Sequence, residues 1–185
     1  KRRSNIENWR IYHKTLGATK NLDFNADALD TATNRWNDTE PTSSVFSIGN
    51  HSSVNFSGDD YVAYLFAEKK GFSKFGSYTG NGNADGTFVY TGFKPAWIMV
   101  KRTDSVQDWP IFNNKLRPAN NVDNYFLYAN LSSAQDTTNQ FDILSNGFKL
   151  RMTSDLANAS GGSYIYMCFA ESPFTTSTGI PTTAR

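Results

Sequence analysis

Short apolar segments alternate with turns along the whole chain. Tryptophan and isoleucine stand two residues apart at residues 9–11 and again at 109–111, and this period predicts strands with one buried face. Residues 61–67 and 164–170 are apolar at both parities, so we predict that each forms a central strand covered on both faces. The pattern favours an all-β chain.

Glycine and asparagine mark the turns between these segments, because both residues accept a positive φ at small cost. Short strands joined by regular turns favour a β-sandwich or jelly roll, in which antiparallel sheets bury their facing sides. Residues 26–33 and 131–137 could each hold a helical turn, but their polarity favours loops. The turn signals lie at residues 49–50, 57–58, 80–82, 85–86, 146–147 and 160–162.

The chain contains an internal repeat. Residues 1–12 align without a gap with residues 101–112, and Lys, Arg, Trp and Ile coincide. Residues 55–68 align with residues 158–171 at an offset of 103. The two matches keep their order and their offsets differ by three residues, so we infer duplication of a unit of about 100 residues.

The repeat predicts a tandem arrangement. We assign residues 1–72 to a first β-sandwich repeat, 73–174 to a second and complete one, and 175–185 to a polar tail that is extended unless a partner orders it. Residues 75–100 have no counterpart in the first repeat. We therefore expect the missing strands to come from upstream chain or from a neighbour, since an open sandwich edge would otherwise be exposed.

Charge and composition narrow the partners. The chain has 18 Lys and Arg against 17 Asp and Glu and a pI near 8.0, so it lacks the basic footprint of a nucleic-acid-binding protein. It has no apolar run of about 18 residues, so we expect no membrane insertion. Its 14 Phe, 9 Tyr and 4 Trp suit pleated sheets.

Candidate chemistry is sparse. Cys168 lies in an apolar run and is expected to be a small buried hydrophobe. Residues 81–86 echo the start of a calcium loop, but position twelve is Gly92 and not an acid. Glu68 and Glu171 share a repeat position, and we expect each to close its own domain by bonding an amide or a cation. We predict no enzyme, no catalytic residue, no cofactor and no metal site.

One aromatic residue is a candidate for ligand binding. Trp36 stands in a polar run, and an exposed indole could stack on a sugar. Packing of this ring against its own domain is the preferred alternative. Trp9 and Trp109 recur in both copies and are interpreted as core anchors.

Three motifs together resemble a poorly characterised, repeated domain of tailed-phage structural proteins, of the kind carried by marine and cyanobacterial phages. They are residues 76–82 (GSYTGNG), 91–102 (TGFKPAWIMVKR) and 161–171 (GGSYIYMCFAE). The resemblance implies a concanavalin-like or jelly-roll sandwich in a tail fibre, baseplate or head appendage. It names no catalytic residue, and the truncated first copy departs from its pattern.

The expected function is accordingly that of a bacteriophage virion structural protein, a tail-fibre, appendage or head-surface module for host attachment or particle decoration. The expected partners are other virion proteins or further copies of the chain, as a trimer if it is a fibre, together with a host surface glycan. The expected location is the virion surface. Two alternatives stay open: a lectin-like carbohydrate-binding module and a polysaccharide depolymerase.

Overall fold

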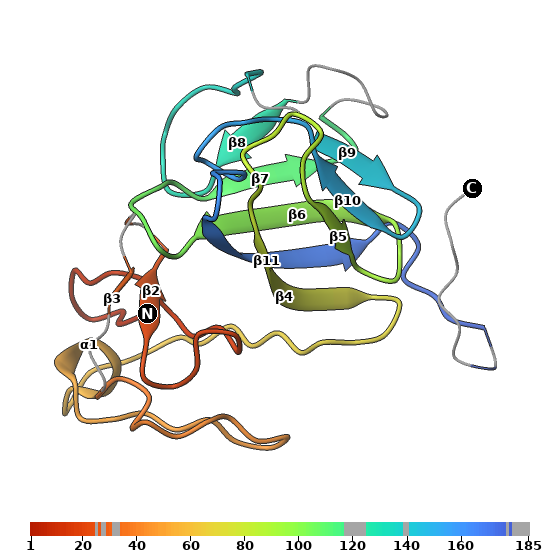
Figure 1. Ribbon diagram of the computed structural model, residues 1–185. Coiled ribbons are helices and arrows are strands. Elements are labelled where there is room, and N and C mark those ends of the chain that lie inside the picture. The colour runs from red at the N-terminus through yellow and green to blue at the C-terminus, as the bar shows by residue number, and fades with distance from the viewer. Residues whose placement is uncertain are drawn as a thin grey trace. The chain divides into compact units, whose positions relative to one another are not determined.

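The computed structural model describes residues 1–24, 26, 29–30, 34–116, 125–138, 141–176 and 178, with residues 29 and 30 described for their backbone only (Figure 1). The chain divides into two compact units, Lys1–Phe66 and Ala67–Arg185. This division comes before the boundary predicted after residue 72. The reason is local: Lys69 forms a β-bridge with Ser73, and the Ser73 hydroxyl donates to the Ala67 carbonyl at 2.7 Å.

The described elements are almost all strands. The first unit contains β1 (Arg10–Ile11), β2 (Asn21–Asp23), β3 (Leu29–Asp30) and one helix, α1 (Ser52–Asn55). The second unit contains β4 (Ser73–Thr79), β5 (Phe88–Tyr90), β6 (Pro95–Arg102), β7 (Pro110–Asn113), β8 (Phe126–Tyr128), β9 (Phe141–Leu144), β10 (Gly147–Leu150) and β11 (Ser163–Ala170). The predicted all-β class is confirmed, while the short helix α1 was not predicted.

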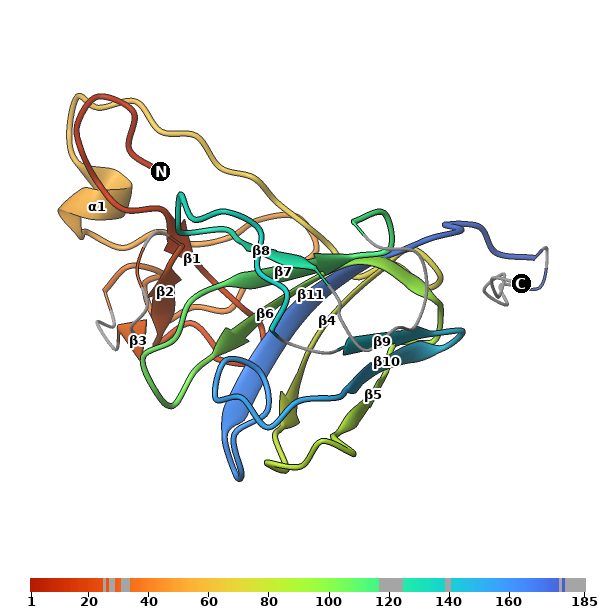
Figure 2. The same cartoon turned by 90° about the horizontal axis from the view of Figure 1, so that it is seen from above.

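Two antiparallel sheets build the second unit. A five-stranded sheet has the order β4-β11-β6-β7-β8, and a three-stranded sheet has the order β5-β10-β9. Figures 1 and 2 show the smaller sheet lying over one face of the larger. Strand β11 pairs with β4 on one side and with β6 on the other, so the predicted central position of residues 164–170 is confirmed.

An aromatic stack joins the two sheets of the second unit. The rings of Phe112 and Phe141 lie 4.4 Å apart and nearly parallel, and Phe148 follows at 4.8 Å from Phe141. Phe112 comes from the larger sheet, whereas Phe141 and Phe148 come from the smaller one. Phe126 extends the stack at 5.4 Å from Phe112. Burial of these rings is the main attraction between the sheets.

Cys168 belongs to the same core. Its side chain is fully buried, and its Sγ lies 3.5 Å from the Lys74 carbonyl oxygen. Burial raises the pKa of this thiol to about 12, above its ordinary value of 9.0. The thiol is therefore protonated at neutral pH and shielded from solvent.

We expect native Cys168 to react with an aromatic disulfide reagent at pH 8 at least roughly 100-fold more slowly than the unfolded chain. Since folding raises this pKa, thiolate formation favours the unfolded state. The stability that the thiol contributes is present below pH 9 and is lost as the pH rises from 9 toward 12. Absorbance of the aromatic thiolate that the reagent releases measures the rate of this reaction, with Cys168→Ala as the blank. Rapid labelling of the native protein would contradict the buried position.

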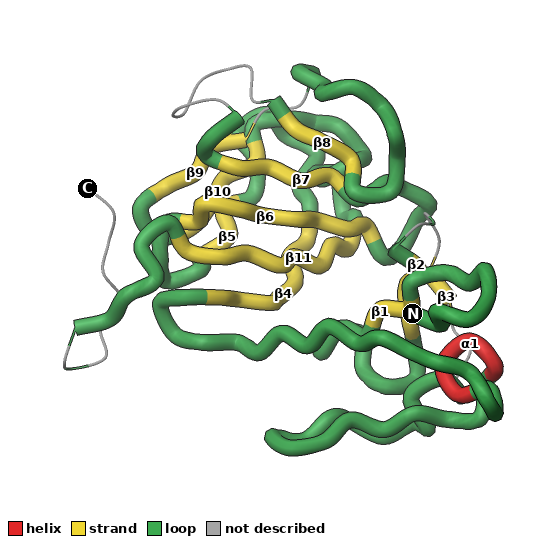
Figure 3. Tube along the Cα trace, turned by 180° about the vertical axis from the view of Figure 1, so that it is seen from behind, coloured by secondary structure: helices red, strands yellow, loops and turns green. Residues whose placement is uncertain are grey.

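The first unit is mostly loop, as Figure 3 shows. Its described strands form a sheet with the order β1-β2-β3. The prediction of a central strand at residues 61–67 is wrong: Tyr61 makes one isolated bridge to Arg2, and the residues that follow are not a strand. The second unit shows why, because its central strand is held between two others, and the strands corresponding to them are missing from the described first unit.

Two further predictions differ from the structure or fall outside it. Trp109 is a core anchor at 2 % exposure, but Trp9 is 37 % exposed, because the described residues of the first unit form no second sheet that covers it. Residues 131–137 form a loop, as expected, apart from an isolated β-bridge between Asp136 and Phe126. Most of residues 26–33 and of the tail 175–185 lie outside the described residues. No helix formed by the described part of the chain is long and apolar enough to cross a membrane.

Candidate functional site

A hydrogen-bonded turn occurs at repeat-equivalent positions in both units. The Asn158 side-chain amide donates to the Met152 carbonyl at 2.7 Å, and the Asn55 amide donates to the Gly49 carbonyl at 3.0 Å. The glycines three residues later, Gly161 and Gly58, have φ of 74° and 83°. This left-handed conformation is why glycine stands there in each copy.

A tyrosine locks the same turn in each unit. The Tyr164 hydroxyl accepts a bond from the backbone N–H five residues before it and donates to the carbonyl nine residues before it, both at 2.8 Å. The Tyr61 hydroxyl makes the same two bonds at the same distance of 2.8 Å. The local geometry therefore repeats along with the residues.

The strand ladder next to this turn also repeats, but only for a short distance. Thr103 N donates to Ser163 O at 2.8 Å in the second unit, and Arg3 N donates to Asp60 O at 2.8 Å in the first. Lys1 and Val62 then exchange two backbone hydrogen bonds of 3.0 Å. Here the ladder of the first unit stops, whereas β11 continues to Ala170.

The segment beyond this point is apolar and exposed. We call residues 63–65 the open edge, because none of the described strands pairs with them. Tyr64 is 68 % exposed and Leu65 is 73 % exposed, and the neighbouring Phe66 is 59 % exposed. The Tyr64 ring stacks on Trp9 with centroids 5.9 Å apart. An exposed apolar segment beside an unfinished ladder is a template for pairing.

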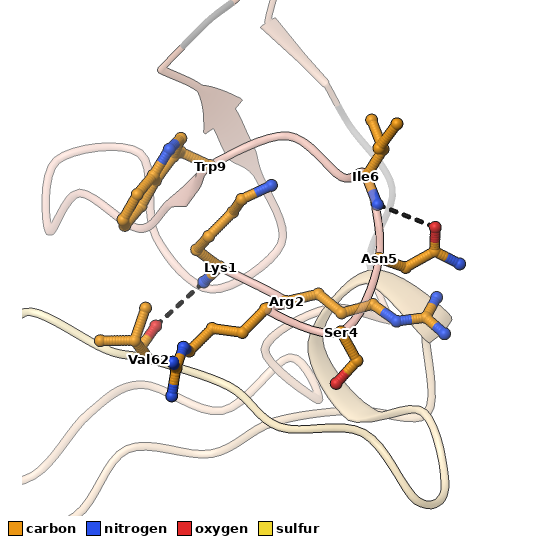
Figure 4. Close-up of a pocket in the computed structure, with 8 residues that line it drawn as sticks. Lys1, Arg2, Ser4, Asn5, Ile6, Trp9 and Val62 are labelled. Carbon is orange, nitrogen blue, oxygen red and sulfur yellow. Dashed lines mark hydrogen bonds between the residues drawn. The ribbon is translucent and has the colours of Figure 1, made fainter.

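A pocket of about 700 Å³ lies beside the end of the ladder (Figure 4). The Lys1 backbone nitrogen points across it to the Val62 carbonyl. Arg2 forms an ion pair with Asp59, and its guanidinium lies 4.6 Å from the centre of the Phe56 ring. The pocket is lined by Lys1, Arg2, Arg3, Ser4, Asn5, Ile6, Trp9 and Val62.

Trp36 packs within the first unit. Its Nε1 donates to the Lys20 carbonyl at 3.1 Å, and Tyr12 meets the indole edge to face at 6.2 Å. The Tyr12 hydroxyl donates to the Glu40 carboxylate. Partial burial, together with this bond and the Glu40 charge, raises the pKa of Tyr12 to about 12. The indole is half-buried, so packing takes part of its surface, and its role in ligand binding stays a prediction.

A polar interior in the first unit was not expected from the sequence. Arg10 pairs with Asp23 in the first unit, as Pro110 pairs with Tyr128 in the second. In the first unit this pair is charged, and Arg10 Nη1 binds the Asp23 carboxylate at 2.5 Å. Asn21 is fully buried and accepts from Arg35 Nη1 at 2.9 Å, at the position that Phe126 occupies in the second unit. Comparison of the two copies could have indicated this polar interior, because polar residues of the first copy stand at strand positions that are aromatic in the second.

The two acidic features of the second unit serve its own structure. Asp85, in the calcium-like segment, binds Lys149 Nζ at 2.7 Å and Arg151 Nη1 at 3.0 Å. Lys149 first, and then Arg151, lowers the pKa of this carboxyl. Glu171 binds Lys94 at 2.9 Å, so its predicted contact with a cation is confirmed. In the described part of the chain, no three His, Cys, Asp or Glu side chains are grouped to hold a metal.

A second surface feature is aromatic. Phe169 on β11 lies 5.8 Å from Trp97 on β6, 6.3 Å from Phe75 on β4 and 5.9 Å from Phe72. These rings are partly exposed, and Phe169 has the opposite parity to the buried Cys168. They therefore lie on the outer side of the larger sheet, where aromatic faces can receive an apolar partner or a sugar.

Comparison with known proteins identifies a family but no described function. A family model named as a domain of unknown function (DUF7483) matches residues 1–173, a stretch that contains both copies of the turn. Neither the curated proteins nor the solved structures contain a match to the chain. Since the family model covers nearly the whole sequence, the chain belongs to the DUF7483 family of domains of unknown function.

Proposed function

We propose that this chain is a structural module of a bacteriophage virion that acts by binding and display and not by catalysis. Its place is a tail fibre, another appendage or the head surface, where it serves host attachment or particle decoration. In this proposal each unit derives from one antiparallel sandwich of the concanavalin-like or jelly-roll type, and the first is incomplete. Self-association, as a trimer in a fibre, completes the proposed assembly.

The observation that carries this proposal is what the two units have in common. The repeated turn, with its asparagine, glycine and tyrosine, is scaffold, because these groups bond to backbone and hold strands in place. The interior next to it differs between the units. Duplication that retains a scaffold and changes its surroundings suits a modular structural protein better than an enzyme, whose chemistry depends on one set of side chains.

The resemblance to phage structural proteins rests on the same scaffold. Its three motifs fall on β4, β6 and β11, which are neighbours in one sheet. The resemblance thus covers three adjacent strands at one side of this sheet and their adjoining turns. This supports a shared architecture in the virion and leaves the receptor to be found by experiment.

The proposal is tested on particles. We expect peptides of this chain, measured by mass spectrometry, to remain at constant stoichiometry with the capsid protein through repeated gradient purification of virions. Antibodies against the chain should label an appendage or the head surface in electron micrographs. A replication protein of the same phage serves as the control and should disappear during purification. Loss of the chain together with that control would refute a virion role.

The aromatic cluster favours glycan binding as a second candidate function. Trp97 and Phe169 offer ring faces on the outer side of the larger sheet. Calorimetric titration with polysaccharide from the host surface tests this, with Trp97→Ala expected to weaken binding at least tenfold, which is about 1.4 kcal/mol. Trp36→Ala is measured in the same titration as a second variant. A loss of affinity on this change alone would move the site to the first unit.

A further inference from the structure

The outer side of the smaller sheet carries aromatic rings that the core does not use. Strand β5 lies at one edge of this sheet, and its middle residue, Val89, points into the core. Phe88 and Tyr90 point the other way, because side chains alternate along a strand, and they are 44 % and 60 % exposed. Neighbouring exposed rings, unlike single ones, mark an interaction surface.

The strand register shows which side chains share this surface, which we call the β5 face. Residues directly opposite each other in paired strands point to the same side of a sheet. The face has two rows, the first formed by Phe88, Lys149 and Asp142 and the second by Tyr90, Gly147 and Leu144. Aromatic rings and charged groups therefore lie side by side on the β5 face.

The glycine of the β5 face makes room for a ring. A Cβ atom on Gly147 would stand 3.0 Å from two carbon atoms of the Phe88 ring and 2.2 Å from the Val89 carbonyl oxygen. Phe88 therefore lies over the backbone of β10, which explains glycine at this position. Tyr90 pairs with Gly147, so no side chain of β10 stands beside its ring there. The Lys74 ammonium lies 5.5 Å from the centre of the Tyr90 ring and helps to hold it in place.

Ion pairs hold the polar groups beside these rings in position. Asp85 Oδ1 binds Lys149 Nζ at 2.7 Å and Arg151 Nη1 at 3.0 Å. Arg151 Nε in turn binds Asp142 Oδ2 at 2.6 Å. The side chains of Asp85 and Arg151 nevertheless stay 75 % and 41 % exposed, so water or a ligand can reach their polar atoms. Hydrogen-bonding groups that are already fixed lose less entropy when a ligand binds to them.

We propose that the β5 face binds an uncharged saccharide chain, with Tyr90 stacking on a sugar ring and the neighbouring ion-paired groups bonding to sugar hydroxyls. A pyranose ring has an apolar C–H face, which suits an aromatic ring, and a hydroxyl edge, which suits charge-assisted hydrogen bonds. This site goes beyond the proposed function because it does not depend on a virion location. It also lies on a different sheet from the aromatic cluster around Phe169.

Charge and spacing select this ligand over others. Lys149 and Arg151 are neutralised by the carboxylates they bind, so they offer little net attraction to a nucleic-acid backbone. The centre of a protein interface is poor in charged residues, because each buried charge must be desolvated. Phe88 and Tyr90 stand two residues apart, about 6.6 Å along a strand. A saccharide chain lying along β5 therefore meets both rings.

The test is affinity electrophoresis of the whole 185-residue chain in native gels that contain a soluble polysaccharide. Laminarin, galactomannan and dextran are the uncharged probes, and polygalacturonate is the charged one. We expect retardation by at least one uncharged probe and none by polygalacturonate. Tyr90→Ala is expected to weaken this binding at least about tenfold, and Arg151→Gln is expected to weaken it in the same direction.

Matched variants make the result specific. Phe174→Ala removes an aromatic ring that is 69 % exposed outside the β5 face and should leave the binding unchanged. Tyr90 and Arg151 have exposed side chains, so their variants should keep the thermal unfolding temperature, and a loss of binding is then distinct from a loss of folding.

Three outcomes overturn the proposal. They are no retardation by any uncharged probe, retardation by polygalacturonate alone, and binding that survives both Tyr90→Ala and Arg151→Gln. Binding that is lost in Trp97→Ala and kept in Tyr90→Ala would assign the saccharide to the larger sheet, and it belongs to the third outcome if Arg151→Gln also binds. Particle purification tests the virion role independently, so failure of either proposal is recognised separately.

Discussion

Phe148→Ala is expected to lower the unfolding free energy of the second unit by about 3–5 kcal/mol, the usual cost of removing a buried aromatic ring. Phe148 has no exposed surface, and its ring lies 4.8 Å from Phe141, 5.4 Å from Tyr166 and 6.1 Å from Tyr78. Its neighbours come from both sheets, so the cavity would open between the layers. Urea unfolding followed by circular dichroism measures the loss.

Phe174→Ala is the matched control, because the same atoms are removed from a ring that is 69 % exposed. This change is expected to cost less than about 0.5 kcal/mol. If Phe148→Ala also cost under about 1 kcal/mol, the sheets would not depend on this stack.

Asn158→Ala is expected to have the second largest effect, a loss of about 3 kcal/mol from the second unit, since several buried polar groups lose their partner at once. The Asn158 amide donates to Met152 O at 2.7 Å and to Asn83 O at 2.9 Å, and its Oδ1 accepts from Asn81 N at 3.0 Å. The side chain is fully buried, so water cannot readily replace these bonds. Thermal unfolding measures the change.

The repeat provides the control for this prediction. Asn55 occupies the equivalent position, but it is exposed and donates to Gly49 O alone among the bonds described for its side chain. Asn55→Ala is expected to cost no more than about 1 kcal/mol. Equal losses for the two variants would show that the turn, and not the buried network around Asn158, carries the effect.

Local patterns predicted the structure well wherever the second unit supplied a partner. The glycine signal at residues 160–162 and the apolar run at residues 164–170 form a turn and a central strand. The same patterns misled in the first unit. Residues 61–67 have the composition of a strand, but none of the described strands pairs with them. Trp9 has the spacing of Trp109, but no second sheet among the described residues of the first unit covers it.

The polar interior and the short helix were missed for a different reason. Arg10, Asp23 and Asn21 read as solvent-exposed strand residues, and only their mutual contacts make burial acceptable. The helix α1 has four residues, too few to give a periodic signal. The aromatic cluster around Phe169 likewise depends on contacts between residues of β6, of β11 and of β4 with the turn before it, which are far apart in sequence.

The sequence by itself determined the all-β class, the repeat and the positions of the turns, because each of these depends on residue types and spacings along the chain. Only the tertiary structure decided which apolar segment is covered and which is exposed, where buried charges find partners, and where the ladder between Lys1 and Val62 stops. Strand pairing joins residues far apart in sequence, so its outcome depends on which partners are present.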